Sequence, residues 1–317
     1  MQGSAMLAST KRLIVRIGTV LVVMALLVAA LWWWAADHAK VHAYAGTSPP
    51  ASITSALNKQ PRVALVLGGG GPRGFAHVGV LKVLEREGIV PDIIVGSSMG
   101  ALIGAVYGTK PNVAALETFI VDADLGASWR DLTLVRSPWL KGDQLEAMLR
   151  VQLGDSRLES LRIPAVAVAT DVLRGEPVAF VTGDAVTAIR ASTAVPGTFK
   201  RVSIQAGEYF DGDISSPVPV RIARQLGAQI VIAVDVMCHP TEMMEVMRDY
   251  PDLILSDFYR HAMNLRDLPL ADVVISPRLG YYAGFSREER IRFIAIGKKA
   301  ATAALPALRK LLTRETK

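Results

Sequence analysis

The chain has 317 residues, of which 51% are hydrophobic and 20% are charged, and this composition excludes a disordered or collagen-like chain. The length is enough for one large α/β domain or two small ones. The formal net charge is +6, and half of it lies in residues 1–45. The remainder is only mildly basic and has no arginine-rich stripe, so nucleic acid is not expected as a partner.

The first part of the chain has the pattern of a membrane anchor. Residues 17–36 contain no charged residue, and that length spans a bilayer. Basic residues in 1–16 precede this run and Trp32–Trp34 lie near its far end, which favours an amino terminus inside the cell. We expect an uncleaved transmembrane signal anchor at 17–36, a tether at 37–60, and the rest of the chain on the periplasmic face of a bacterial inner membrane. The alternative is a cleaved signal peptide and a secreted protein, because Ala43–Ala45 has the small-x-small form of a cleavage site.

After the tether, short β-branched runs alternate with helical patterns. Helices are expected up to about Arg86, from Met99 to about Tyr107, and, with a basic amphipathic pattern, over 287–312. The predicted strands are residues 63–67, 93–95, 165–169, 178–181, 230–234 and 273–275. This alternation predicts a three-layer α/β/α fold with a mostly parallel central sheet. We expect its core at 61–228, with residues 229–317 completing the same domain.

A glycine-rich turn, Gly68–Gly74, follows the first predicted strand and precedes a helix. It contains G-x-G-x-x-G at Gly69, Gly71 and Gly74, which is the dinucleotide-binding fingerprint. That fingerprint also needs an acidic residue at the end of the second strand, where this chain has Gly96-Ser97-Ser98-Met99-Gly100 instead. The glycines leave backbone N–H groups open to an anion or a developing oxyanion. A tight turn that packs a helix on a strand is the alternative.

The pentapeptide Gly96–Gly100 has the form G-x-S-x-G and is centred on Ser98. A strand, a sharp turn and a helix form the context of a nucleophile elbow. Glycine at both ends removes side chains that would clash in such a turn. Ser98 would then lie at the positive end of the following helix, with the Met99 N–H facing the reacting oxygen. The sequence therefore predicts that Ser98 is a nucleophile.

A serine nucleophile needs a base, and the chain offers two candidates. The usual base is histidine. Of the five histidines, His239 follows a strand end and is the one plausible member of a triad, although a polar residue at a strand-to-helix turn is the other interpretation of it. The second candidate is Asp211, which lies in the tight glycine turn Tyr209–Asp213.

Four motifs, taken together and in this order, resemble the patatin-like phospholipase family. They are Gly-Gly-Gly-x-Arg-Gly at Gly69–Gly74, Gly-x-Ser-x-Gly at Gly96–Gly100, Ala-Ser-x-Ala-x-Pro-x-x-Phe at Ala191–Phe199, and Asp-Gly at Asp211–Gly212. The resemblance covers about residues 63–225. It implies a serine lipid acyl hydrolase with a Ser–Asp dyad, no histidine in the reaction, and neither metal nor cofactor. Its substrate would be a phospholipid, a lysophospholipid or another acyl ester.

Carried over to this chain, the resemblance makes Ser98 the nucleophile and Asp211 the proton acceptor, ionised near neutral pH. The backbone of Gly69–Gly71 would form the oxyanion hole, and Arg73 would order that loop or meet a phosphate. The family usually has glycine or alanine where this chain has Asp213. A carboxylate there raises the pKa of Asp211 if both groups face the site. We expect Asp213 to point to solvent instead.

Two other functions remain open from the sequence. One is a non-catalytic lipid-binding or regulatory protein with the same fold. The other is an α/β-hydrolase whose triad consists of Ser98, an acid and His239. Cys238 is the only cysteine, which excludes an intramolecular disulfide and a cysteine-based metal site.

Overall fold

The computed structural model describes residues 42–44, 61–122, 142–237, 251–281 and 283–314. The expected membrane anchor at 17–36 lies outside these residues. Within the described ranges, no helix combines the length and the apolar character needed to cross a bilayer.

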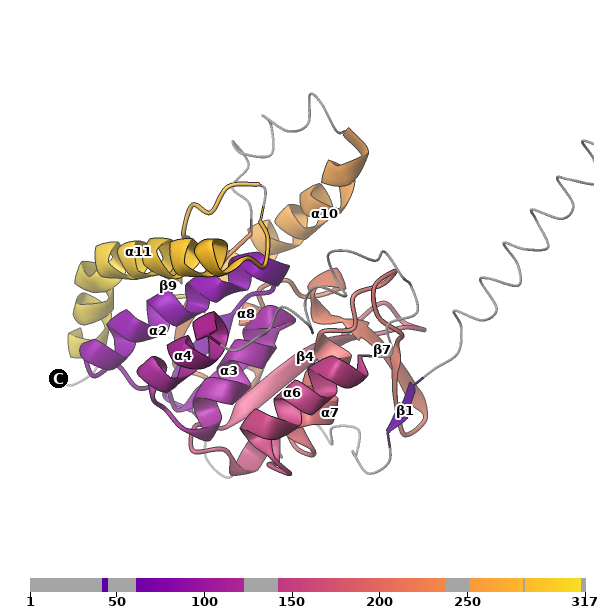
Figure 1. Ribbon diagram of the computed structural model, residues 1–317. Helices are drawn as coiled ribbons and strands as arrows, with labels where there is room; N and C mark the ends of the chain where they lie inside the picture. The colour runs from indigo at the N-terminus through magenta and orange to yellow at the C-terminus, as the bar shows by residue number, and fades with distance from the viewer. Residues whose placement is uncertain (1–41, 45–60, 123–141, 238–250, 282, 315–317) are drawn as a thin grey trace, which may run out of the picture. The chain divides into compact units, whose positions relative to one another are not determined.

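A mixed sheet forms the centre of the described structure (Figure 1). Its order is β1-β6-β7-β4-β3-β2-β8-β9, and β5 pairs with β4 beside this path. The β2–β3, β3–β4, β2–β8, β8–β9 and β1–β6 pairs are parallel, whereas β4–β5, β4–β7 and β6–β7 are antiparallel. The strands are β1 His42–Tyr44, β2 Val63–Leu67, β3 Ile93–Ser97, β4 Ala165–Asp171, β5 Pro177–Phe180, β6 Val202–Ile204, β7 Gly207–Asp211, β8 Ile230–Val234 and β9 Val273–Ile275.

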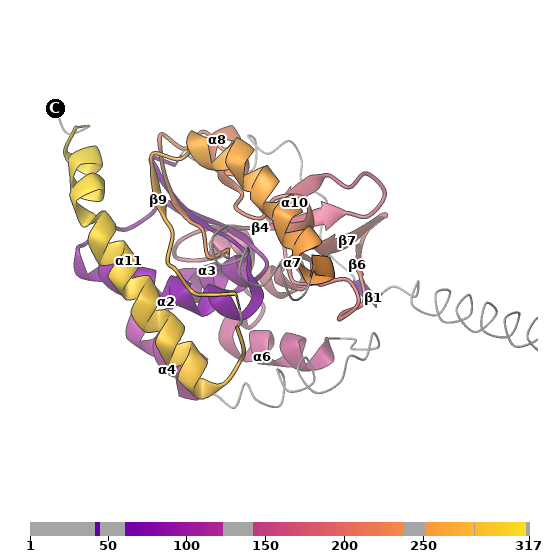
Figure 2. The same cartoon turned by 90° about the horizontal axis from the view of Figure 1, so that it is seen from above.

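Helices cover both faces of this sheet, as the view in Figure 2 shows. One face carries α2 Ala76–Arg86, α3 Met99–Thr109, α4 Val113–Asp122, α6 Asp143–Leu153, α7 Ala185–Ser192 and α11 Arg287–Arg314. The other face carries α8 Val220–Gln225 and α10 Pro251–Asp267. Short 3-10 turns lie at η2 Gly71–Phe75, η3 Leu158–Ser160, η4 Gly212–Ile214 and η5 Leu268–Leu270. The predicted three-layer fold with a mostly parallel sheet is confirmed.

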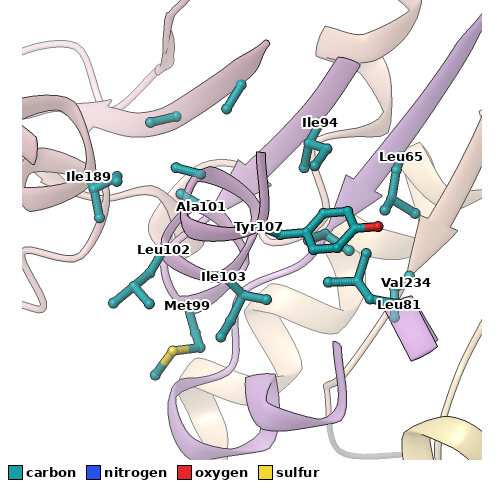
Figure 3. Close-up of a cluster of buried hydrophobic side chains, with 14 of the residues drawn as sticks. Leu65, Leu81, Ile94, Met99, Ala101, Leu102, Ile103, Tyr107, Ile189 and Val234 are labelled. Carbon is teal, nitrogen blue, oxygen red and sulfur yellow. The ribbon is translucent and has the colours of Figure 1, made fainter. Parts of the chain in front are cut away.

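Successive residues of the central strands point to two separate cores. In β2, Leu65 and Leu67 belong to the core under α2 and α3, whereas Ala64 and Val66 belong to the core under α8. All of β2 is therefore buried, which explains why the strand is apolar throughout instead of alternating with polar residues. Figure 3 shows the first of these cores, with α3 among side chains from the strands, α2 and α7.

Helix α3 lies directly on the sheet because three of its residues have no side chain. A Cβ at Gly100 would lie 2.0 Å from the Leu67 carbonyl oxygen, and one at Gly104 would lie 2.6 Å from a methyl carbon of Ile94. A Cβ at Gly108 would lie 2.5 Å from the Ile163 carbonyl oxygen. This close approach fixes where α3 begins, and hence where the residue before it is held.

The C-terminal helix is joined to the layer that carries α2 in the same way. A Cβ at Gly79 of α2 would lie 2.0 Å from the Ile294 carbonyl oxygen, and one at Gly297 of α11 would lie 2.0 Å from the Ala76 carbonyl oxygen. The two helices therefore touch backbone to backbone. Helix α2 follows the glycine-rich turn, so α11 also holds the far end of that turn in place.

Two features of the sheet were not predicted from the sequence. His42–Tyr44, within the segment interpreted as a tether, forms edge strand β1 parallel to β6. The hairpin β6–β7, which ends at Asp211, was also missed. Strands of three to five residues are too short to give a clear periodic pattern, and they form here because neighbouring strands offer unpaired backbone groups.

Candidate active site

Strand β3 delivers Ser98 to a strained turn at the start of α3. Its backbone lies at φ 50° and ψ −123°, in a region that residues with a side chain rarely adopt. Glycine is required on both sides of it, because a Cβ at Gly96 would lie 2.4 Å from the Ala101 backbone nitrogen and one at Gly100 would meet Leu67. The structure thus has the geometry that the G-x-S-x-G spacing predicts.

The Ser98 hydroxyl is hydrogen-bonded to Asp211, which lies 113 residues further along the chain. Ser98 Oγ donates to Asp211 Oδ2 at 2.7 Å, and both residues are buried, with exposed fractions of 5% and 2%. Asp211 is the last residue of β7, where its N–H donates to the Ala194 carbonyl at 3.0 Å. Its second oxygen, Oδ1, accepts the N–H of Asp213 at 2.8 Å. The structure therefore brings together the two residues that the resemblance pairs.

The pKa of Asp211 is raised from its ordinary value to about 8. Burial is the largest cause, and the negative charge of Asp213 is the second. Hydrogen bonds from the Asp213 N–H and from Ser98, and the positive charge of Arg260, act in the opposite direction but do not cancel the rise. Asp211 therefore holds a proton more firmly than the sequence suggested. The reason is that its carboxylate is buried away from water and lies near a second carboxylate, that of Asp213.

Asp213 does not point to solvent, so that expectation is wrong. Its side chain is 2% exposed and lies against Gly69 of the glycine-rich turn, where a Cβ would be 1.6 Å from Asp213 Oδ1. Its other oxygen, Oδ2, accepts a hydrogen bond from Arg260 Nη2 at 2.6 Å. Helix η4 turns the chain inward immediately after Asp211, which buries Asp213 between the base candidate and the loop.

The N–H groups of the glycine-rich turn are not all available to a ligand. Gly68 N–H donates to the Val234 carbonyl at 3.0 Å, and Gly69 N–H donates to the Pro217 carbonyl at 2.9 Å. The N–H groups of Gly70 and Gly71 have no such backbone acceptor in the described part of the chain, and Gly71 lines the pocket beside Ser98. Gly69 thus offers no N–H to a ligand, and its role in the loop is the absence of a side chain. The N–H donors that remain in the turn are those of Gly70 and Gly71.

Arg73, which is itself buried, holds the turn in place through contacts with residues 280–281. Its Nε donates to the Gly280 carbonyl at 3.2 Å, its Nη2 donates to the Tyr281 carbonyl, and its guanidinium lies over the Tyr281 ring at 5.7 Å. These are contacts of a residue that orders the loop. Gly74 completes the turn, because its missing side chain leaves room for Met99 of the elbow, whose Cγ would lie 2.2 Å from a Cβ there.

His77 supports the same turn from inside the core, a role that the sequence did not reveal. Its Nε2 lies 2.7 Å from the Gly68 carbonyl oxygen and must donate to it, because that oxygen can only accept. The ring is fully buried, and burial lowers the pKa of His77 to about 4, so it is neutral near pH 7. His77 is the second residue of α2, and it meets the Gly68 carbonyl only because the helix packs beneath the turn.

Ser192 holds the elbow itself and was predicted only as part of a motif. Its hydroxyl accepts the N–H of Ser98 at 2.9 Å and donates to the Val168 carbonyl of β4 at 2.5 Å. A neighbouring hydroxyl, Thr170 Oγ1, donates to the Asp211 carbonyl at 2.8 Å. The Ala191–Phe199 motif therefore ties the strained serine to the sheet.

An apolar pocket of about 200 Å³ opens beside Ser98. None of its lining residues, within the described ranges, is ionisable at neutral pH. Most of its wall comes from α3, α6 and the loop after α7, with the apolar side chains of Met99, Leu102, Leu145, Val195, Phe199 and Phe285. The arrangement suits a hydrocarbon chain attached to a group that reacts at Ser98.

The remaining candidates from the sequence are His239, Cys238 and a metal site. His239 and Cys238 lie outside the described residues, so a histidine triad has no described geometry. No cluster of three or more histidine, cysteine or acidic side chains with metal-ligand geometry occurs among the residues that the structure covers.

Comparisons with known proteins agree with the motifs. A family model described as patatin-like phospholipase matches residues 65–224. An uncharacterized NTE family protein of Mycobacterium tuberculosis is 35% identical over 193 residues, which is 58% of this chain and 52% of that protein. The lysophospholipase nte1 of Aspergillus fumigatus is 33% identical over 179 residues, which is 55% of this chain and 12% of that protein. This chain thus spans about half the length of the first relative and much less of the second.

Solved structures give a weaker likeness. The crystal structure of VipD from Legionella pneumophila matches with a TM-score of 0.46 and 12% identity, over 78% of this chain and 67% of that chain. A likeness at this level carries no argument about function.

The raised pKa of Asp211 predicts how the reactivity of Ser98 depends on pH. Asp211 can accept the Ser98 proton only when it is ionised, so we expect reaction with a fluorophosphonate to be slow at pH 6 and to rise as the pH passes through about 8. The rate of covalent labelling, followed by intact-protein mass spectrometry from pH 5 to 10, measures this. A rate that is already at its plateau at pH 6 would contradict the raised pKa.

Proposed function

The chain belongs to the patatin-like phospholipase family, and on that premise we propose that it is a serine lipid acyl hydrolase with a Ser98–Asp211 dyad. The observation that carries the proposal is the hydrogen bond of 2.7 Å from Ser98 Oγ to Asp211 Oδ2, at the mouth of an apolar pocket. Nucleophile and base within hydrogen-bond distance are the arrangement that covalent catalysis needs.

In the first step, ionised Asp211 accepts the Ser98 proton while Oγ attacks the carbonyl carbon of the ester. The carbonyl oxygen becomes an oxyanion beside the N–H groups of Gly70 and Gly71, and one such donor typically contributes about 2.7–4 kcal/mol to the transition state. When the tetrahedral intermediate collapses, the C–O bond to the leaving alcohol breaks, and Asp211 returns the proton to that alcohol. The acyl group remains on Ser98.

In the second step, water replaces the alcohol. Asp211, ionised again, accepts a proton from the water as its oxygen attacks the acyl carbonyl, and the same N–H groups hold the oxyanion. Collapse releases a fatty acid and returns the proton to Ser98 Oγ. The burial that raises the pKa of Asp211 makes it a stronger base once it has lost its proton.

The pocket indicates how the substrate is placed. Its apolar wall suits the acyl chain, and the absence of a charged lining residue in the described ranges leaves the head group outside. A phospholipid or lysophospholipid fits this arrangement, and one relative is named a lysophospholipase. The substrate class proposed here is therefore an acyl ester of a glycerolipid.

Chain-length selection should follow the size of the pocket. A dry cavity of about 150 Å³ accommodates benzene, so 200 Å³ holds about eight carbons. Each buried methylene contributes about 0.8 kcal/mol, so kcat/KM for 4-nitrophenyl esters should rise about fourfold per carbon and level off near eight. Leu145→Ala should move the plateau to longer chains. The best rate with acetate, or a rise without a plateau, would contradict this placement.

The dyad is tested by substitution. Ser98→Ala and Asp211→Asn should each lower ester hydrolysis by at least about 1,000-fold, because each removes a group that takes part in proton transfer or bond formation. His239→Ala should retain most of the activity. Folding of each variant is checked by circular dichroism. Loss of activity in a folded His239→Ala protein would replace the dyad with a histidine triad.

Covalent labelling separates an enzyme from a lipid-binding protein of the same fold. A fluorophosphonate should label the purified protein, and peptide mass spectrometry should place the adduct on Ser98. A folded sample that binds lipid vesicles but is never labelled would favour the non-catalytic function.

We also propose that residues 17–36 anchor the protein in the inner membrane of a bacterium, with the domain in the periplasm. The support comes from the sequence: an uncharged run of bilayer length, basic residues before it and tryptophans at its far end. Full-length protein should remain in the membrane fraction, and protease added to spheroplasts should degrade the domain. A mature protein that begins at Gly46 would show secretion, and complete protection from protease would show the opposite orientation.

A further inference from the structure

The position after the Asp-Gly pair places a second carboxylate inside the active site. The N–H of Asp213 donates to Asp211 Oδ1 at 2.8 Å. The carboxylate of Asp213 lies against Gly69, which precedes Gly70 and Gly71, the two glycines with available N–H groups. Both of the places where the proposed reaction carries negative charge, the base and the oxyanion, are therefore beside Asp213.

A buried negative charge in that position opposes the reaction. It disfavours ionisation of the base, and it repels the oxyanion that forms on the substrate. The effect is strong because water is excluded around Asp213, whose side chain is 2% exposed. The site therefore needs a positive charge that compensates Asp213.

Arg260 supplies that charge from the other side of the sheet. It lies on α10, which covers the face of the sheet opposite α3 (Figure 2). Its Nη2 donates to Asp213 Oδ2 at 2.6 Å. Its side chain is 27% exposed, so the guanidinium meets a buried carboxylate while part of the side chain remains in contact with solvent. The two residues are 47 positions apart in the chain, and only the fold brings them together.

Charged groups elsewhere on β4, α7 and α10 and after β8 contact other partners. Asp171 on β4 accepts backbone N–H groups of the turn at 171–174, and Arg190 on α7 lies over the Phe199 ring. Asp235, after β8, accepts the Met237 N–H. Asp267 on α10 pairs with Arg221 and Arg266. His77 below the loop is neutral. Among the described residues, Arg260 is the cation that pairs with Asp213 and whose charge acts on Asp211.

We propose that Arg260 is a positioning residue of this active site, which neutralises Asp213 and holds its carboxylate between the base and the oxyanion loop. This inference rests on the proposed function, because the charge matters only if an oxyanion forms there. Arg260 does not line the pocket beside Ser98, and its contact with the site is the ion pair with Asp213.

The central test compares kcat and KM of four purified full-length variants. Arg260→Met should lower kcat on the order of tenfold, which corresponds to about 1.4 kcal/mol, and leave KM within about twofold, because the uncompensated charge acts on the transition state. Arg260→Lys should recover part of the loss. The double variant Asp213→Asn/Arg260→Met should return kcat close to the original value, because no charge then needs compensation.

Asp213→Asn alone should move the acid limb of the pH profile of kcat/KM to lower pH by about one unit, since it removes a negative neighbour of Asp211.

Arg266→Met is the matched control. Arg266 lies on the same helix and pairs with Asp267, another buried carboxylate, at 3.0 Å, but within the described structure it makes no hydrogen bond or ion pair with Ser98, Asp211 or Asp213. Its kcat and pH profile should not change. If Arg260→Met does not fold, recovery of folding and activity in the double variant still supports the proposal.

Three results would overturn the inference while the proposed function stands. They are an unchanged kcat in folded Arg260→Met, a double variant no more active than Arg260→Met, and a double variant that also fails to fold. If the unaltered protein neither hydrolyses esters nor reacts with a fluorophosphonate, the proposed function fails, and this inference fails with it.

Discussion

A side chain at position 100 would occupy the space of the Leu67 carbonyl oxygen, and the site depends on this contact between a helix and a strand. Because α3 begins directly on the sheet, the residue before it has no relaxed conformation available and stays at φ 50°. That conformation places the Ser98 hydroxyl within hydrogen-bond distance of Asp211, at the end of β7. The Ser98 N–H donates to the Ser192 hydroxyl, which in turn donates to the Val168 carbonyl of β4, and these bonds keep the turn from relaxing.

Several contacts fix the glycine-rich turn, so its remaining N–H groups already have a fixed direction before a substrate binds. Val234 and Pro217 accept the first two N–H groups, His77 donates to the Gly68 carbonyl, and Arg73 bonds the segment at 280–281. Donors that are fixed before the reaction need no reorganisation when charge develops, which is the main source of oxyanion stabilisation. The contact of α11 with α2 extends this support to the C-terminal part of the chain.

Charge is the second constraint. Two carboxylates lie in a nearly dry site, and burial together with their mutual repulsion raises the pKa of Asp211. In the proposed mechanism, a positive charge outside the reacting groups must offset the second carboxylate. The layer of helices on the far face of the sheet takes part in that control through Arg260, so both helical layers contribute to a site that lies at the ends of the strands.

The sequence by itself determined the fold class, the elbow at Ser98 and the glycine turn. These features follow from local requirements: apolar strands alternating with helices, and glycines wherever a backbone must turn sharply or touch its neighbour. Tertiary structure alone decided that Asp213 is buried, that Gly69 gives its N–H to Pro217, and that His77, Ser192 and Arg260 support the site. Burial and hydrogen-bond partners depend on residues that are distant in the chain and meet only after the layers have packed, and no local pattern encodes that meeting.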